Sequence, residues 1–208
     1  MQTTTPKIGI LAIQGDYQAH AAMLDRLGAA HNLVRWPRDL ELLDGVILPG
    51  GESTTMLKFL SEEGLDRALV DFASEGGAIF GTCAGTILLA REVKNPPQRS
   101  LNLLDAAVLR NAYGRQLASE IRREPTSLRA EPLEMVFIRA PIIESVGPGV
   151  EVLARSAHQP VLVRQGAILA ATFHPELTAD TSVHELFLQI ASAPAPPDKN
   201  VAARTAKS

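Results

Sequence analysis

The sequence lacks the features that extracellular, membrane or nucleic-acid functions require. One cysteine among 208 residues excludes an internal disulfide and suits a reducing compartment. No apolar run is long enough to cross a bilayer, and the N-terminus lacks the charged-then-apolar pattern of a signal peptide. The net charge of −3 gives no electrostatic basis for binding nucleic acid or an anionic membrane. We therefore expect a cytoplasmic protein with neither nucleic acid nor membrane as its main partner.

The remaining composition is that of an ordinary globular domain. Hydrophobic residues make up 46% and charged residues 21%, and the chain is long enough to bury one full core. We predict a single domain over residues 1–192. Residues 193–208 are rich in proline, alanine and lysine and have too little apolar surface to pack, so we expect this tail to be disordered.

The first half of the chain alternates short apolar runs with amphipathic stretches, which predicts βαβ units and a parallel sheet covered on both faces. The expected strands are 8–13, 33–36, 45–48 and 78–80. The expected helices are 17–27, 52–60, 65–74 and 84–93.

The second half contains short expected strands with little helix between them. These strands are 108–110, 135–138, 150–154, 161–164 and 167–172, and an expected helix over 180–191 follows them. Gln165-Gly166 is typical of a tight hairpin turn. We predict a three-layer open α/β sheet: a mostly parallel core, helices on both faces and added antiparallel edge strands.

The single cysteine, Cys83, lies in the run Gly81-Thr82-Cys83-Ala84-Gly85, between an expected strand and an expected helix. This run is the G-x-S-x-G nucleophile elbow with sulfur in place of oxygen. A sharp turn exposes the side chain at its tip, and glycines allow the bend and the close approach of a substrate. Because N–H groups at a helix start favour the thiolate, Cys83 is a candidate nucleophile. The alternative is a buried structural cysteine, the commoner role of a free thiol.

A cysteine nucleophile needs a base, and His174 is the histidine best placed to serve. It follows an expected buried strand, in Thr172-Phe173-His174-Pro175-Glu176. Ligand sites in open parallel sheets form outside the carboxyl ends of the strands, where Cys83 also lies. Glu176 can accept the imidazole N–H and fix its tautomer, as the acidic member of a triad does. The alternative is a strand-terminating turn with solvated side chains.

A glycine-rich loop follows a third expected strand, within Leu48 to Thr55. Gly50 and Gly51 leave backbone N–H groups exposed ahead of a helix, and such groups can hold a phosphate or stabilise an oxyanion. The G-x-x-x-x-G-K-[ST] pattern of a phosphate-binding loop is missing. Taken alone, the loop is explained more simply as a structural turn with a helix cap.

The other four histidines show no sign of a chemical role. His20 and His184 fall within expected helices, where an isolated histidine is more often solvated or a packing residue; His31 precedes a strand and His158 lies in an expected turn. No pair of histidines has metal-ligand spacing alongside a cysteine or carboxylate cluster. We predict neither a metal nor a cofactor.

Together these residues resemble the class I, triad-type glutamine amidotransferases, which have a flavodoxin-like fold. Within that class the chain closely resembles the family of glutaminase subunits of pyridoxal 5′-phosphate synthase, from Ile8 to about Phe187. The elbow and the His-x-Glu pair mark the wider class. The segments typical of the narrower family are Pro49–Thr55, Arg110–Gln116 and Phe137–Pro141.

The resemblance implies hydrolysis of L-glutamine, with Cys83 as nucleophile, His174 as base and acid, and Glu176 as the residue that orients His174. It implies an oxyanion hole made by the backbone N–H groups of Gly51 and Ala84. The residues that it implies for binding glutamine are Gly51, Glu52, Ser53, Arg110, Ile138 and Arg139. An arginine suits the α-carboxylate of the substrate, because a guanidinium binds a carboxylate in a planar fork. Glu52 would pair either with the α-ammonium or with a nearby arginine.

The resemblance also implies a partner. Unprotonated ammonia would pass to a separate synthase subunit in a hetero-oligomer, for the synthesis of pyridoxal 5′-phosphate (vitamin B6). Gln14-Gly15 would lie near the docking face and the oxyanion hole, where a glycine lets a peptide reorient. Two alternatives remain: a glutaminase subunit that feeds another acceptor, and a non-catalytic assembly module with the same fold.

Overall fold

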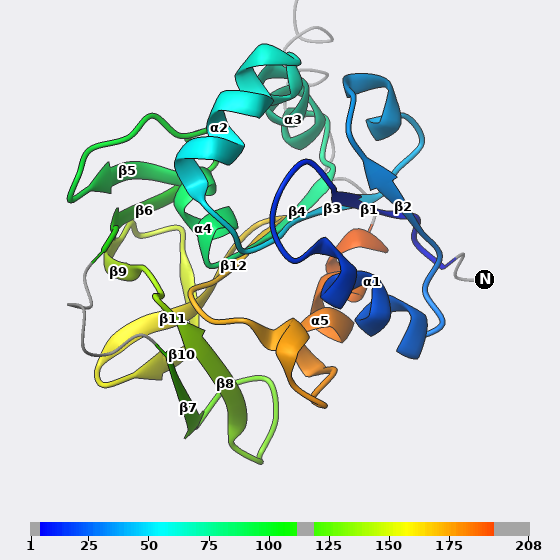
Figure 1. The fold of residues 1–208 in the computed structure, drawn as a ribbon. Helices are drawn as coiled ribbons and strands as arrows, with labels where there is room; N and C mark the ends of the chain where they lie inside the picture. Colours follow the sequence, from blue (N-terminus) through cyan, green and yellow to red (C-terminus); the bar gives the residue numbers. More distant parts are fainter. Residues whose placement is uncertain (1–4, 112–118, 194–208) are drawn as a thin grey trace, which may run out of the picture.

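The computed structural model describes residues 5–111 and 119–193, and a large twisted sheet runs through its centre (Figure 1). The strands of this part of the chain are β1 (Ile8–Leu11), β2 (His31–Val34), β3 (Gly45–Leu48), β4 (Ala78–Thr82), β5 (Ala90–Lys94), β6 (Leu104–Leu109), β7 (Ser119–Glu124), β8 (Leu133–Ile138), β9 (Ile142–Val146), β10 (Glu151–Ser156), β11 (Gln159–Gln165) and β12 (Ile168–Ala171). The α-helices are α1 (Tyr17–Arg26), α2 (Ser53–Glu62), α3 (Leu65–Ser74), α4 (Ala84–Leu89) and α5 (Ser182–Ala191), and the 3-10 helices are η1 (Pro37–Leu40) and η2 (Pro175–Leu177).

The large sheet has the strand order β10-β11-β12-β4-β3-β1-β2. The five strands from β12 to β2 are parallel, and β11 and β10 extend this sheet in antiparallel pairing. Two small sheets lie beside it: β5-β6-β9 and the β7-β8 pair. The parallel core carries the short apolar runs of the sequence because both of its faces are covered.

Alternation along the central strands divides the core into two layers. Val46 and Leu48 belong to one hydrophobic cluster and Ile47 belongs to the other, since successive side chains of a strand point to opposite faces. Buried residues of α2, α3 and α4 complete the first cluster, and those of α1 and α5 complete the second. Figure 1 shows these two groups of helices on opposite sides of the sheet. The predicted three-layer arrangement is therefore confirmed.

Most expected elements of the first half are present with ends shifted by a few residues. The hairpin turn at Gln165-Gly166 is confirmed, since β11 and β12 pair antiparallel and Gly166 has a φ of 57°. The added antiparallel edge is confirmed for β11 and β10. β12, in contrast, lies inside the parallel core beside β4.

The expected helix over 84–93 is wrong in its second half, where 90–94 form β5. Ala90 and Val93 are buried while Arg91 and Glu92 are exposed, a spacing of three that resembles one face of a helix. A register shift between Ala90 and Glu92, in the pairing of β5 with β6, produces this spacing in a strand.

The sequence prediction also missed β7 and β9. β7 has no buried residue, so it lacks the apolar alternation by which a strand is found. It is held by its partner β8, through the Arg123–Glu134 ion pair and the Arg122 guanidinium over the Phe137 ring. Residues 112–118 lie outside the described part of the chain, and so does the predicted tail except Ala193, whose N–H donates to Ile190 O.

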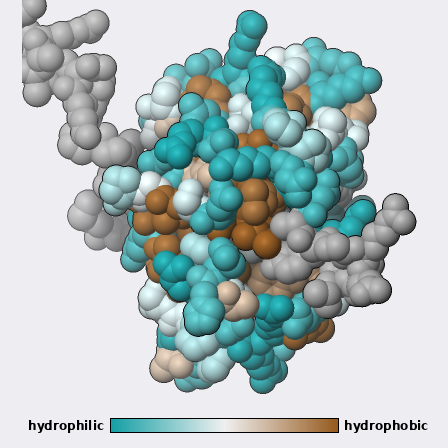
Figure 2. All heavy atoms as spheres, turned by 90° about the vertical axis from the view of Figure 1, so that its left-hand side faces the viewer, coloured by the Kyte–Doolittle hydropathy of each residue, from teal (hydrophilic) through white to brown (hydrophobic). Residues whose placement is uncertain are grey.

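None of the helices in the described part of the chain has the length and apolar character needed to cross a membrane. Figure 2 shows the side on which β5 and β6 lie: hydrophobic residues gather in the middle of this face and hydrophilic residues surround them. Apolar surface with a polar rim is typical of faces that meet a partner.

Gly85 allows α4 to approach β3 closely. A Cβ atom at this position would overlap the backbone carbonyl oxygen of Leu48. We expect Gly85→Ala to lower the free energy of unfolding by about 1–3 kcal/mol, as overpacking does. The gain in helix propensity, about 1 kcal/mol, is smaller than the cost of moving rigid backbone.

Urea unfolding followed by circular dichroism measures this change. Gly149→Ala is the matched control, because its added Cβ would lie 3.9 Å from the nearest atom, Gln165 Nε2. We expect this control to stay within about 0.5 kcal/mol of the parent protein. Equal stability of the two variants would contradict the close approach of α4 and β3.

Candidate active site

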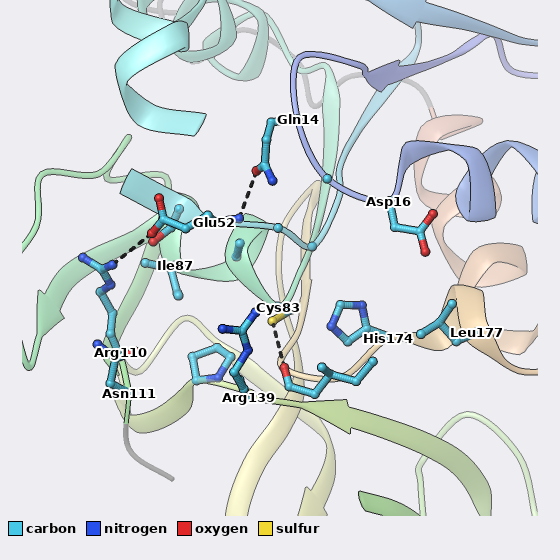
Figure 3. A pocket seen from close by; sticks show the side chains of 17 residues that line it. Gln14, Asp16, Glu52, Cys83, Ile87, Arg110, Asn111, Arg139, His174 and Leu177 are labelled. Carbon is cyan, nitrogen blue, oxygen red and sulfur yellow. Dashed lines mark hydrogen bonds and ion pairs between the residues drawn. The ribbon is translucent and has the colours of Figure 1, made fainter. Parts of the chain in front are cut away.

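Cys83 occupies the sharp turn between β4 and α4. Its φ of 47° and ψ of −101° are rare for a residue with a side chain, and such strain is typical of functional sites. The Cys83 N–H donates to Ala171 O at 2.8 Å, which fastens the turn to the end of β12. The side chain is only 7% exposed, and Sγ lies 3.8 Å from Ile138 O. The cysteine is buried, as the structural alternative expects, but it lines a cavity (Figure 3).

His174 lies beside Cys83 because β12 and β4 are adjacent parallel strands. The chain continues from β12 through Thr172 and Phe173, and the His174 N–H is held by Val136 O at 2.8 Å. His174 Nδ1 lies 2.7 Å from Glu176 Oε1, and the Glu176 side chain is fully buried in η2. Figure 3 shows the His174 ring next to the Cys83 sulfur. The structure thus brings the three predicted residues into one array.

The surroundings of His174 favour its protonated form. Burial alone would lower its pKa, but hydrogen bonds with Cys83 and Glu176 and the negative charges of both outweigh burial and raise the pKa to about 10. The ring is therefore an imidazolium at neutral pH. A cation next to the sulfur stabilises the thiolate, which is the nucleophilic form of cysteine.

The loop between β3 and α2 touches both His174 and the segment after β1. A Cβ atom on Gly50 would overlap the His174 ring, and one on Gly51 would come within 2.5 Å of Gln14 Oε1. The Glu52 N–H donates to Gln14 Oε1 at 2.9 Å. Gly15 has a φ of 100°, and a Cβ there would overlap Gly50 O. Gly15 therefore has to be a glycine, and Gln14-Gly15 lies directly against the loop.

Glu52 pairs with an arginine, one of the two partners left open by the sequence. Its Oε1 lies 3.5 Å from Arg110 Nη2, and Arg110 also donates to Thr54 Oγ1 at 2.9 Å. The Glu52 carboxylate accepts the N–H groups of Thr54 and Thr55 and so caps α2. Burial would raise the pKa of Glu52, but these hydrogen bonds lower it. Glu52 is therefore a fixed anion at the cavity.

Arg139 is the cation left available in the cavity. It has a φ of 45° and points into the cavity in Figure 3. Arg139 has no hydrogen-bond or ion-pair partner among the residues that the structure describes.

The cavity has a volume of about 500 Å³ and collects all of the predicted site residues except Glu176, which lies behind His174. Its other lining residues were not among the predicted site residues: Asp16, Gly50, Ile87, Asn111, Pro141 and Leu177. Three of these were within reach of the motifs: Gly50, Asn111 and Pro141 belong to the quoted family segments, whereas Ile87 lies one helical turn beyond Cys83. The rest of the Arg110–Gln116 motif lies outside the described residues.

Two histidines are more than the solvated or packing residues that we expected. His20 and His184 are both completely buried and contact each other. His20 Nε2 also lies 3.5 Å from Glu176 Oε1. No local pattern in the sequence indicates this contact, since His20 and Glu176 come from distant segments.

Solved structures share this architecture. A crystal structure described as a glutamine amidotransferase matches with a TM-score of 0.85 and 46% identity, over 89% of this chain and 99% of that one. The structure of PurLQS from Thermotoga maritima matches with a TM-score of 0.68 at 16% identity, which supports the fold alone. The fold is that of the class I glutamine amidotransferases, as predicted.

Curated relatives narrow the class. The chain is 55% identical to "Pyridoxal 5'-phosphate synthase subunit PdxT" of Koribacter versatilis over 184 residues, which cover 88% of this chain and 95% of that protein. It is 49% identical to the Deinococcus radiodurans protein of the same name, over 88% of this chain and 96% of that protein. The SNO glutamine amidotransferase family matches residues 10–192. This chain belongs to that family, and the resemblance found in the sequence is confirmed.

The raised pKa of His174 gives a direct test of the array. Glu176→Gln and Cys83→Ala each remove an anion beside the ring, so we expect each to lower the His174 pKa from about 10 toward its ordinary value of 6.5. An NMR titration of the His174 ring in the three proteins measures the change. Since pairing raises the folded-state pKa, its contribution to stability is complete below pH 6.5 and is lost as pH rises through about 10. The same midpoint in all three proteins would contradict the pairing.

Proposed function

We propose that this chain is the glutaminase subunit of a pyridoxal 5′-phosphate synthase, which hydrolyses L-glutamine and delivers ammonia to a synthase subunit. Curated relatives that carry this subunit name are 45–55% identical over 88% of the chain. The observation that carries the proposal is the pairing of Cys83 with His174 inside a cavity that holds both fixed cations and a fixed anion. A free amino acid has a carboxylate and an ammonium to match them.

Glutamine binds with its α-carboxylate on Arg139 and its α-ammonium near Glu52. Arg139 is the guanidinium of the cavity that has no partner among the described residues, whereas Arg110 already contacts Glu52 and Thr54. This orientation leaves the side-chain carboxamide directed toward Cys83. Ser53 and the backbone of Gly51 and Ile138 line the remaining wall of the cavity.

The first half of the reaction forms a thioester. The Cys83 thiolate adds to the carboxamide carbon, and the oxyanion that develops accepts hydrogen bonds from the backbone N–H groups of Gly51 and Ala84. The tetrahedral intermediate then collapses. The C–N bond breaks as the His174 imidazolium gives its proton to the departing amine, which leaves as ammonia.

The second half releases glutamate. Neutral His174 takes a proton from water, and the resulting hydroxide adds to the γ-glutamyl thioester. Breaking of the C–S bond regenerates the Cys83 thiolate beside the His174 imidazolium. Glu176 keeps the imidazole in one tautomer and stabilises the cation throughout.

The contact between Gln14-Gly15 and the Gly50-Gly51 loop offers a route by which the partner adjusts the oxyanion hole. Gln14 Oε1 accepts the Glu52 N–H, and the Asp16 N–H donates to Gly50 O. A synthase subunit that moves Gln14-Gly15 would therefore move the peptides on either side of Gly51. Coupling of this kind would limit ammonia release to the assembled hetero-oligomer. The required thiolate suits a reducing compartment such as the cytoplasm.

Replacing the nucleophile separates the two steps of the assembled enzyme. We expect Cys83→Ala, mixed with the synthase subunit, to make pyridoxal 5′-phosphate from added ammonium salt but not from glutamine. Glutamate release should fall by at least about a thousandfold, because the covalent route is lost. Circular dichroism verifies that the variant is folded. Glutamate release at the parent rate would refute the assigned nucleophile, and failure to associate with the synthase subunit would favour another acceptor.

The assigned orientation of glutamine predicts a change in KM. Arg139→Met removes a charge-assisted pair with the α-carboxylate, so KM should rise roughly 10- to 100-fold. The matched control is Arg123→Met, which removes an exposed arginine paired with Glu134. Steady-state glutaminase kinetics in the presence of the synthase subunit measure both variants. A fall in kcat with an unchanged KM would contradict binding of the carboxylate by Arg139.

A further inference from the structure

Two buried imidazoles lie behind the Cys83–His174–Glu176 array. His20 on α1 and His184 on α5 are both 0% exposed, and His20 Nδ1 lies 3.0 Å from His184 Nε2. The two helices are neighbours on one face of the sheet (Figure 1). The Phe80 ring makes T-shaped contacts with both histidines. Burial lowers the pKa of both groups, that of His184 to about 3, so both are uncharged at neutral pH.

The outer nitrogen of His20 faces the array. His20 Nε2 lies 3.1 Å from Thr82 Oγ1 and 3.5 Å from Glu176 Oε1. The same oxygen, Oε1, accepts the hydrogen bond from His174 Nδ1 at 2.7 Å. Oε2 of Glu176 is buried without a partner among the described residues. One carboxylate oxygen is therefore held between two imidazoles.

Two observations assign the tautomer of His20. A bare lone pair on Nε2 would face the anionic Oε1, which is repulsive, so Nε2 carries the proton. His20 Nδ1 is then an acceptor, and His184 Nε2–H donates to it. This leaves His184 Nδ1 as a bare acceptor, and Nδ1 is the buried His184 atom that has no partner in the described part of the chain. The opposite tautomers would bury an unpaired N–H, which is rarer and more costly than an unpaired acceptor.

We infer that His20 is a positioning residue for the glutaminase reaction: its Nε2–H donates to Thr82 Oγ1 and lies 3.5 Å from Glu176 Oε1, so its partial positive charge holds the Glu176 carboxylate in line with His174, and His184 fixes the His20 tautomer. Without this contact, the carboxylate would depend on its bond to His174 alone, and the imidazole that it orients would be less restrained. The inference rests on the proposed function, because it assigns His20 a role in that reaction. His20 does not line the cavity, so it should act on turnover and not on glutamine binding.

Three substitutions separate positioning from packing. His20→Gln places an amide N–H near the position of Nε2 and keeps a donor that faces Thr82 and Glu176. His20→Asn places its amide near Nδ1 and loses that donor, and His20→Leu loses both polar groups. We expect His20→Asn and His20→Leu to lower kcat about 10- to 100-fold, as loss of an orienting partner does, with KM for glutamine changed by no more than about twofold. His20→Gln should keep kcat within about threefold of the parent enzyme.

Leu24→Ala is the matched control for lost stability. Leu24 lies one turn beyond His20 on α1 and is equally buried, and its apolar side chain belongs to the hydrophobic cluster on this face of the sheet. We expect this variant to lower the unfolding midpoint while kcat stays near that of the parent. Glutaminase assays use the full chain with the synthase subunit. Equal losses of kcat in His20→Gln, His20→Asn and His20→Leu would overturn the inference, and so would a parent-like kcat in both His20→Asn and His20→Leu.

Two further measurements do not depend on glutaminase activity. Because Cys83 is the single cysteine, iodoacetamide alkylation reports its thiolate directly. We expect His20→Asn and His20→Leu to lower the ratio of the alkylation rate at acidic pH to the rate at alkaline pH, and His20→Gln to leave this ratio unchanged. Parent-like alkylation ratios in His20→Asn and His20→Leu would overturn the inference even if no variant hydrolysed glutamine. Shifted ratios without glutaminase activity in the parent protein would refute only the proposed function.

The tautomer itself can be observed in the unmodified protein. ¹⁵N NMR of the histidine rings distinguishes a protonated from a bare Nε2, so no variant needs to fold for this test. We expect His20 to be protonated at Nε2 alone and His184 to be protonated at Nε2 alone. A bare Nε2 on His20 would overturn the inference.

Discussion

The parallel pairing of β4 with β12 is the constraint on which the site depends. Thr82 and Ala171 are partners in the last register position of this pair, and the Cys83 N–H continues it by donating to Ala171 O. The chain leaves both strands at the same edge of the sheet, toward α4 on one side and toward His174 on the other. A slip of one residue would turn every side chain of a strand to the opposite face. The thiol and the imidazole therefore meet only because hydrophobic packing on both faces fixes this register.

Sequence reasoning could predict the array because its signals are local. The glycines around Cys83 and the His-Pro-Glu run after a buried strand each indicate a turn at a strand end, and parallel sheets bring such ends together. The cavity wall was predicted only through the family segments, since nothing in the spacing of Arg110 and Arg139 indicates that they face one ligand. The role of His20 had no local signal at all. Its partner Glu176 is brought to it by the packing of α1 against η2.

The fold was predictable where burial is regular and not where it is irregular. The central strands are apolar without alternation because both faces are covered, and each was found. β5 was not predicted because a bulge gives this strand the burial spacing of a helix. β7 was not predicted because it has no buried residue and is held by cross-strand pairing. In both cases the strand is defined by its pairing with another strand, β6 for β5 and β8 for β7, and not by the pattern of its own residues. Local propensity does not contain that information.

Because Glu176 is buried, its negative charge acts on one cation, the His174 imidazolium. A carboxylate removed from water is costly unless it is paired, and its pairing here is with the His174 imidazolium on one side. A second cation on the other side would share the negative charge and weaken its hold on His174. His20 and His184 are kept neutral by burial, so they supply a directed N–H without competing for that charge. Histidine therefore serves two roles at Glu176: the neutral His20 orients the carboxylate, and the charged His174 pairs with it. The difference is set by their neighbours, since His174 has both a carboxylate and a thiol beside it.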